Sequence, residues 1–294
     1  MKIGEFTNDA ARARFFDVYT SAFERLWPGP PAAVDVPTTF GRTRVYRAGR
    51  ARGSPVVLLP GAGGNALMWH RYIRPLGESH PLIAVDTIGE AGASVQRAPV
   101  RDGRDGALWL DEVLAALEVA CAHVVGCSYG GWLAVNHEIY RPGRIATLVL
   151  LDPAGFALPG PRFYAWAVAG GLAGLAPRAM RPRLARLVAN GTILEPEIMR
   201  LIPAAARYRR RLPDALVFSD DDLRAVRTRS LFLLAGRSAL HRSRRVAERL
   251  AGVLPGAQVE IVPGAGHALP MDLPDLVAER VLRFVAAGDG PPAG

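Results

Sequence analysis

A serine lies at the centre of a pentapeptide whose residue types suit nucleophilic catalysis. Residues 126–130 are Gly-Cys-Ser-Tyr-Gly, with an apolar run at 122–125 before them and a helix-like segment at 132–140 after them. Strand, tight turn and helix in this order would hold the hydroxyl of Ser128 above the end of a sheet, where a histidine could reach it. The two glycines would let the chain turn so sharply. A chance match is the alternative, and the flanking strand and helix argue against it.

A serine hydroxyl is a weak nucleophile at neutral pH, so the site needs a base within hydrogen-bond reach and an acid that orients this base. His267 is the best candidate for the base, because it follows the last expected strand in the glycine-rich run 263–266. A loop histidine without a special role is the alternative. His241 could also line the site, but we expect it at the surface.

An acyl-transfer site also needs two convergent backbone donors for the oxyanion. One would be the N–H of Tyr129, directly after the serine, and the other would come from the glycine-rich turn 60–65, at Ala62. Such a turn could equally cradle a phosphate. It has neither the lysine of a P-loop nor the spacing of a dinucleotide fingerprint, so we assign it to the oxyanion.

These residues must be positioned by strands that alternate with helices, which predicts a mostly parallel, doubly wound sheet. Strands are expected at 38–48, 55–59, 82–85, 122–125, 145–151, 230–235 and 258–262, and helices at 6–27, 66–76, 106–120, 132–140, 243–254 and 273–287. The alternation stops between residues 156 and 219, where three helix-like pieces and no clear strand occur. We therefore expect a core of residues 1–155 and 220–294 with an inserted helical cap at 156–219.

The length fits one large domain, or one domain with an insertion. The chain has 294 residues, half of them hydrophobic, and a formal charge of +9 that comes mainly from arginine. No nucleic-acid motif occurs, no apolar run is long enough to span a bilayer, and residues 1–9 lack an apolar signal core. Cys121 precedes and Cys127 ends the same expected strand, too far apart along it to bridge, which favours a reducing cytoplasm. We expect no metal and no organic cofactor.

The chain resembles the α/β-hydrolase fold superfamily over nearly its whole length, and within it the bacterial carboxylesterases of the Bacillus naproxen-esterase type. The motifs that carry this resemblance are Leu26-Trp27-Pro28, Val36-Pro37-Thr38-Thr39-Phe40-Gly41-Arg42-Thr43, Leu58-Leu59-Pro60-Gly61, Met68-Trp69, Ala84-Val85-Asp86-Thr87-Ile88-Gly89, residues 126–131 and Gly264-Ala265-Gly266-His267. The resemblance implies Ser128 as nucleophile, His267 as base, and Ala62 with Tyr129 as oxyanion donors. Relatives usually have histidine where Pro60 stands, and we expect little chemical consequence.

A second departure concerns the acid. Relatives place it at the fourth position of a Gly-x-x-Asp/Glu motif after the sixth strand, where this chain has Gly-Arg-Ser-Ala ending at Ala239. Either the acid has moved or the enzyme works as a dyad. Asp152, at the end of the strand after the serine unit, is the best replacement, although Asp-Pro is also a common turn opener. We expect Asp272 to start the closing helix and Asp86 to be structural.

The predicted cap is basic and carries aromatic residues. Residues 161–212 include ten arginines and two acids. Solvated helix faces explain this charge, and a collar for an acidic substrate or an acidic carrier protein is the alternative. Six aromatic residues could wall an acyl pocket, although core packing explains them almost as well: Trp69, Tyr129, Phe156, Phe163, Tyr164 and Trp166.

Three functions are consistent with these features. The first is a serine hydrolase that cleaves a carboxylic ester or lactone of a small-molecule acyl substrate through an acyl-enzyme. The second is a thioesterase or cyclase that acts on a carrier-bound acyl chain. The third is a non-hydrolytic or binding protein on a degenerate hydrolase scaffold, which the alanine at 239 motivates.

Overall fold

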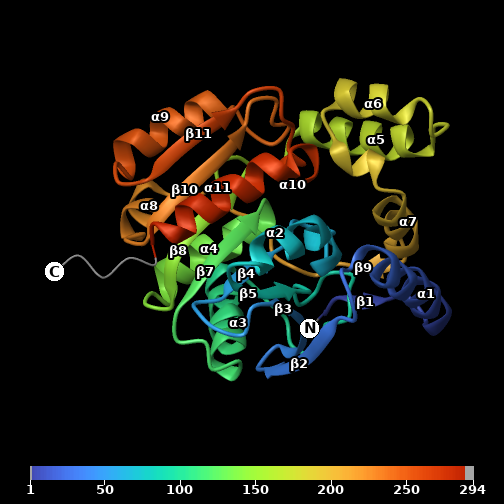
Figure 1. Cartoon of the computed structure of the whole chain (residues 1–294), viewed down its shortest axis with the longest axis horizontal. Coiled ribbons are helices and arrows are strands. Elements are labelled where there is room, and N and C mark those ends of the chain that lie inside the picture. Colours follow the sequence, from blue (N-terminus) through green and yellow to red (C-terminus); the bar gives the residue numbers. More distant parts are fainter. Residues whose placement is uncertain (1, 289–294) are drawn as a thin grey trace.

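The computed structural model describes residues 2–288, which are built around a nine-stranded sheet (Figure 1). The strands from β11 to β5 are parallel, and β3, β2 and β6 run antiparallel to their partners. The predicted mostly parallel sheet is therefore confirmed. In spatial order the strands are β11 (Gln258–Val262), β10 (Arg229–Ala235), β8 (Ile145–Leu151), β7 (Ala122–Cys127), β4 (Val56–Leu59), β5 (Pro81–Val85), β3 (Gly41–Gly49) and β2 (Ala32–Thr38), with β6 (Val95–Gln96) beside β3.

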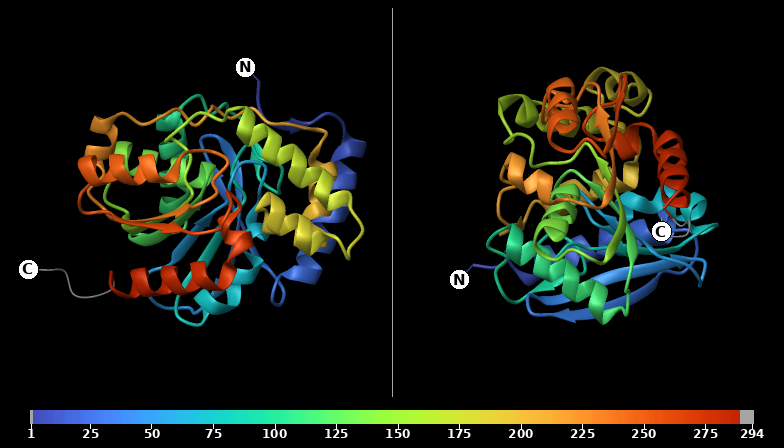
Figure 2. Two further views of the ribbon diagram at one scale, coloured as in Figure 1. Left: turned by 90° about the horizontal axis from the view of Figure 1, so that it is seen from above. Right: turned by 90° about the vertical axis from the view of Figure 1, so that its left-hand side faces the viewer.

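Helices cover both faces of this sheet, as a doubly wound fold requires (Figure 2). Side chains alternate between the faces, so that Val57 and Leu59 of β4 belong to one core cluster and Val56 and Leu58 to the other. One face is covered by α3 (Gly103–Ala116), α4 (Tyr129–Tyr140), α8 (Asp220–Ala225) and α9 (Ser243–Val253). The other is covered by α1 (Asp9–Leu26), the 3-10 helix η1 (Ala66–Tyr72), α2 (Ile73–Gly77), α10 (Leu269–Asp272) and α11 (Pro274–Ala286).

Residues 156–219, here called the cap segment, project beside the carboxyl ends of the strands (Figure 1). They contain α5 (Pro161–Leu175), α6 (Arg181–Val188), the 3-10 helix η2 (Gly191–Leu194) and α7 (Pro196–Ala205). The expectation that this segment lacks a strand is wrong, because β9 (Tyr208–Arg209) pairs with β1 (Glu5–Phe6). A two-residue strand is too short to show a period in the sequence, and it forms only because the N-terminal residues lie beside it. The division of the chain into core and cap stays a prediction.

The first hairpin also differs from its prediction. The sequence predicts one strand at 38–48, whereas the structure has β2 and β3 joined by a tight turn at Thr39 and Phe40. The turn requires Gly41, whose φ is +133° and whose added Cβ would lie 2.2 Å from the carbonyl oxygen of Val95. Proline at position 37 hides β2 in the sequence, and a proline is tolerated there because β2 lies at the edge of the sheet.

Two further observations concern residues 2–288 only. No helix in this part of the chain has the length and apolar character needed to cross a membrane. Within the same residues, no group of three or more His, Cys, Asp or Glu side chains could hold a metal ion.

Candidate active site

Ser128 lies in a strained turn between β7 and α4. Its backbone has φ 48° and ψ −112°, a conformation that costs free energy for a residue with a side chain. The chain can fold so tightly because an added Cβ at Gly126 would lie 2.7 Å from Gly130, and one at Gly130 would lie 2.3 Å from the carbonyl oxygen of Leu59. The Ser128 amide donates to the carbonyl of Leu151 at 3.0 Å, which ties the turn to the neighbouring strand.

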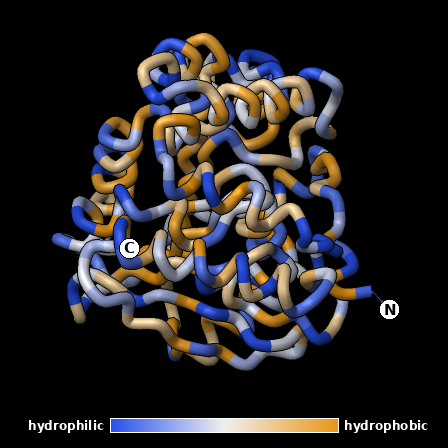
Figure 3. Tube along the Cα trace, turned by 90° about the vertical axis from the view of Figure 1, so that its right-hand side faces the viewer, coloured by the Kyte–Doolittle hydropathy of each residue, from blue (hydrophilic) through white to orange (hydrophobic). Residues whose placement is uncertain are grey.

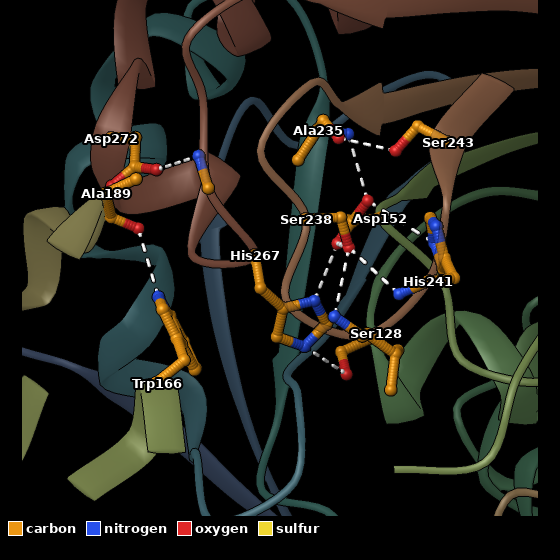
Figure 4. Close-up of polar contacts among 12 residues, drawn as sticks. Ser128, Asp152, Trp166, Ala189, Ala235, Ser238, His241, Ser243, His267 and Asp272 are labelled. Carbon is orange, nitrogen blue, oxygen red and sulfur yellow. Dashed lines mark hydrogen bonds and ion pairs between the residues drawn. The ribbon is translucent and has the colours of Figure 1, made fainter. Parts of the chain in front are cut away.

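His267 lies within hydrogen-bond distance of this serine. Its Nε2 is 2.9 Å from Ser128 Oγ, and the side chain is 7% exposed (Figure 4). The loop that carries it is fixed at Gly266, whose N–H donates to Asp272 Oδ2 at 2.7 Å. A side chain at Gly266 would collide with Ala189 at the end of α6, so the cap segment packs in direct contact with this loop.

Asp152 follows β8, and its carboxylate meets the other nitrogen of the imidazole. Oδ2 lies 2.6 Å from His267 Nδ1 and accepts a 2.6 Å hydrogen bond from Ser238 Oγ, while Oδ1 accepts the N–H of Ala235 at 2.9 Å. Complete burial would raise the pKa of Asp152, but the hydrogen bond from His267, the nearby His241 and the Ser238 hydroxyl outweigh it, so the pKa lies below its ordinary value. The structure therefore brings Ser128, His267 and Asp152 together.

His241 is the residue of this cluster that the sequence misplaces. We expected it at the surface, but its side chain is 1% exposed and Nε2 lies 3.4 Å from Asp152 Oδ1. Burial lowers the pKa of His241 more than the carboxylate raises it, so the neutral imidazole is favoured. Asp152 therefore lies between two histidines. Ser238, also missed, belongs to the short loop after β10, which reaches the end of β8 because the two strands are neighbours.

The other carboxylates considered lie outside this contact chain. Ala239 is buried and supplies no acid. Asp272 does not start the closing helix: Leu273 precedes α11 and makes no side-chain cap, whereas Asp272 accepts the N–H groups of Gly191 and Gly266. Its role is to bind the cap segment to the His267 loop. Asp86 lies in a separate buried network, where it accepts from the hydroxyl of Tyr19 at 2.5 Å and from two backbone amides.

The two expected oxyanion donors flank the serine. Tyr129 is the first residue of α4, so its N–H has no partner within the helix. Ala62 is exposed in a turn closed by the N–H of Gly64, which donates to the carbonyl of Gly61 at 3.0 Å. An added Cβ at Gly61 would lie 3.4 Å from Ser128 Cβ, which shows how closely this turn approaches the serine.

An ion pair with a buried carboxylate supports this turn from outside. The carboxylate of Glu90 accepts the N–H of Gly63 at 3.2 Å and the Nε–H of Arg210 at 2.7 Å. The Arg210 guanidinium also lies 4.7 Å from the centre of the Tyr129 ring. Because Arg210 belongs to the cap segment, one side chain joins this segment to both halves of the expected oxyanion site. The sequence gives no pattern that singles out this pair.

The aromatic residues expected to wall a pocket are divided in the structure. The rings of Phe163 and Trp166, from α5, lie edge-on to His267 at 5.3 and 5.5 Å between centres. The Trp166 indole N–H donates to the carbonyl of Ala189 at 3.3 Å (Figure 4). The ring of Phe156 lies 6.5 Å from the ring of His241, between centres, and not against His267. Trp69 is fully buried against Tyr72 in the core, so packing accounts for it.

The fold is that of an α/β hydrolase, and comparison with known proteins identifies the family. Residues 56–280 match the model of the alpha/beta hydrolase family, and the chain belongs to this family. Carboxylesterase YbfK and the uncharacterized carboxylesterase nap, both from Bacillus subtilis, are each 29% identical to it over 94% of this chain and 94% of their own length.

Solved structures agree with these matches. The crystal structures of carboxylesterase CesB (YbfK) and of naproxen esterase from Bacillus subtilis each superimpose with a TM-score of 0.82, at 28% and 27% identity. They cover 95% and 96% of this chain and 99% and 100% of their own. The predicted resemblance is confirmed, and the chain is a hydrolase-class enzyme similar to these carboxylesterases.

Proposed function

We propose that this protein hydrolyses a carboxylic ester or lactone of a small-molecule acyl substrate, with Ser128 as nucleophile, His267 as general base and Asp152 as the orienting acid. The observation that carries the proposal is the chain of contacts from Ser128 Oγ through the imidazole to a buried carboxylate, 2.9 and 2.6 Å long. The names of the two Bacillus carboxylesterases support an ester as substrate.

The reaction follows from these contacts. His267 Nε2 takes the hydroxyl proton as Ser128 Oγ bonds to the substrate carbonyl carbon, and Asp152 stabilises the imidazolium. The N–H groups of Ala62 and Tyr129 would hold the oxyanion. The imidazolium then gives its proton to the departing alkoxide, which leaves an acyl-enzyme. Water attacks this ester through the same base, releases the acid and restores Ser128.

The surroundings of His267 suit this chemistry. Phe163 and Trp166 restrict water around the imidazole and offer an apolar wall to an acyl group. A cytoplasmic location, proposed from the two free cysteines, Cys121 and Cys127, is a further part of the proposal.

A fluorophosphonate probe tests the nucleophile. We expect covalent labelling of the wild type at Ser128, mapped by peptide mass, and none of Ser128→Ala. We also expect turnover of p-nitrophenyl esters that disappears in the same variant. A folded wild type that neither reacts with the probe nor cleaves an ester would contradict the proposal and favour the degenerate-scaffold hypothesis.

The carrier-bound thioester stays the second candidate, and the basic cap segment is the observation that favours it. Acyl-carrier thioesters compared with oxygen esters of the same acyl chain would decide between the two. Preferential cleavage of the carrier thioester, lost at high salt, would favour the thioesterase.

A further inference from the structure

Helix α5 (Pro161–Leu175) is apolar around its whole circumference and yet lies at the surface. Arg162 is the only charged residue among its fifteen, and only Gly170, Ala173 and Gly174 are buried. A helix of this composition is normally enclosed on all sides. One of its faces therefore lacks a partner among the residues that the structure describes.

The inner face of α5 is well occupied. Phe163 and Trp166 lie against His267, and the three small residues let neighbouring parts of the cap segment approach closely. An added Cβ at Gly174 would collide with Met199 of α7, and one at Gly170 with Asn190. This face thus packs on the active site and on the rest of the cap segment.

The outer face is a straight apolar stripe. Its members recur at intervals of four, four and three residues, so they lie on one side of the helix. Their exposures are 59% for Tyr164, 62% for Val168, 65% for Leu172 and 80% for Leu175. Leu187 of α6, which packs beside α5, is 71% exposed as well. We call these five residues the α5 stripe. Large exposed apolar side chains gathered on one side of a helix, as in α5, mark an interaction site.

The charge around the α5 stripe has one sign. The exposed arginines Arg178, Arg183 and Arg186 follow α5 within the link 176–180 and α6. The two acidic residues of the range 161–212 are engaged elsewhere: Glu195 pairs with Arg71 and lies beside His70, and Glu197 pairs with Arg25 and Arg200. The third acid of the cap segment, Asp214, lies outside α5 and α6. Figure 3 shows this part of the chain, at the top of the view, as apolar stretches interrupted by polar ones.

We propose that the α5 stripe docks on a lipid surface with anionic headgroups. Aliphatic side chains would enter the acyl boundary, and the guanidinium groups beside them would meet the headgroups, as for other interfacial helices. Two cap segments of equal positive charge repel each other, which disfavours a second copy as occupant. The Tyr164 hydroxyl is the only hydrogen-bonding group among the side chains of the stripe, and insertion into the acyl boundary of a lipid surface requires none.

Docking would also define the substrate. The same helix that presents the α5 stripe contacts His267 from its other face, and it lies at the outer edge of the molecule (Figure 1, Figure 2). A bilayer on the stripe would therefore be separated from His267 by the thickness of this one helix. If the proposed ester hydrolysis holds, the ester would be one that partitions into membranes. The docking itself does not depend on hydrolysis.

Vesicle co-sedimentation tests the docking separately from catalysis. The Ser128→Ala protein is mixed with phosphatidylcholine vesicles, or with vesicles of equal parts phosphatidylcholine and phosphatidylglycerol. We expect binding to the anionic vesicles only, weakened by salt. Val168→Asp/Leu172→Asp should weaken this binding by at least about tenfold. Leu216→Asp, at a leucine 64% exposed outside α5 and α6, is the matched control and should bind unchanged.

The α5 double variant with Ser128 intact should cleave a soluble short-chain ester at the wild-type rate, because both positions point away from the site. Absence of binding to anionic vesicles, or equal binding by the double variant, would overturn the proposal. So would a dimer in sedimentation velocity that the double variant dissociates, or a loss confined to carrier-bound thioesters, because either would identify another occupant.

Discussion

Replacing Asp152 by asparagine tests the proposed active site most sharply, because the structure determines how the new amide must lie. Oδ1 accepts the backbone N–H of Ala235, and Oδ2 accepts from both Ser238 Oγ and His267 Nδ1. The Ala235 amide can only donate, so the single oxygen of the new side chain would stay with it. The NH₂ group would then face His267, where it needs an acceptor.

The imidazole of His267 would have to adopt the tautomer that is protonated at Nε2. Nδ1 would become the acceptor, and the proton would move to Nε2, which lies 2.9 Å from Ser128 Oγ and must accept the hydroxyl proton. A serine protease with the equivalent substitution keeps its geometry and loses about 10⁴ in kcat. We expect a loss of this order here, which corresponds to about 5 kcal/mol of transition-state stabilisation.

Steady-state kinetics with a soluble p-nitrophenyl ester measure this effect, and KM should change little because Asp152 is completely enclosed behind the imidazole. Glu138→Gln is the matched control, since it removes a buried carboxylate of α4 that makes no contact with the triad. Thermal unfolding must show that both variants are folded. A folded Asp152→Asn protein with kcat within about tenfold of the wild type would refute the argument and leave His267 acting without an acid.

Three further substitutions test the groups that surround the contacts between Ser128, His267 and Asp152. Arg210→Ala should lower the free energy of unfolding, measured by denaturant titration, by about 3–5 kcal/mol, because it leaves the carboxylate of Glu90 buried without its partner. In steady-state kinetics it should reduce kcat more than it raises KM, and Arg210→Lys should recover part of the stability and part of kcat. Burial lowers the pKa of His241 in the folded protein, so as the pH falls below about 6.5 the imidazole is protonated in the unfolded chain before it is protonated in the folded one, and the free energy of unfolding decreases. His241→Gln should therefore make the fall in Tm between about pH 7 and pH 5 shallower, and identical slopes would contradict this. Asp272→Asn keeps only one acceptor oxygen for the amides of Gly191 and Gly266, so we expect faster amide hydrogen exchange in the His267 loop and a modest loss of kcat. Unchanged exchange would contradict the role of Asp272 in joining the cap segment to this loop.

The sequence predicts the parts of this protein that depend on local patterns. Ser128 can be recognised in the sequence because its tight turn requires glycine at positions 126 and 130. A Cβ added at Gly130, for example, would lie 2.3 Å from the carbonyl oxygen of Leu59. His267 is found because it follows the last strand on a glycine-rich loop. The central strands are found because burial on both faces requires continuous apolar runs. Each of these features depends on residues that are close together in the sequence, so a short sequence window is enough to predict it.

The parts that the sequence hides depend on distant partners. β9 exists because β1, from the other end of the chain, lies beside it. His241 is buried because Asp152 and Phe156, from another strand end, enclose it. Asp272 resembles a helix start but binds two backbone amides of other segments. No pattern within a short window carries such information.

The proposed position of the acid has a geometric explanation. β8 and β10 are adjacent and parallel, with Leu151 opposite Leu233, so their carboxyl ends open on the same space. The N–H of Asp152 donates to the carbonyl of Leu233 at 2.8 Å, and its carboxylate accepts the N–H of Ala235, so this side chain is fixed as firmly to β10 as to its own strand. A carboxylate at either strand end could therefore meet the imidazole. The proposed mechanism requires a buried negative charge at one point beside His267, and with Asp152 there an alanine at 239 leaves no gap in the contacts.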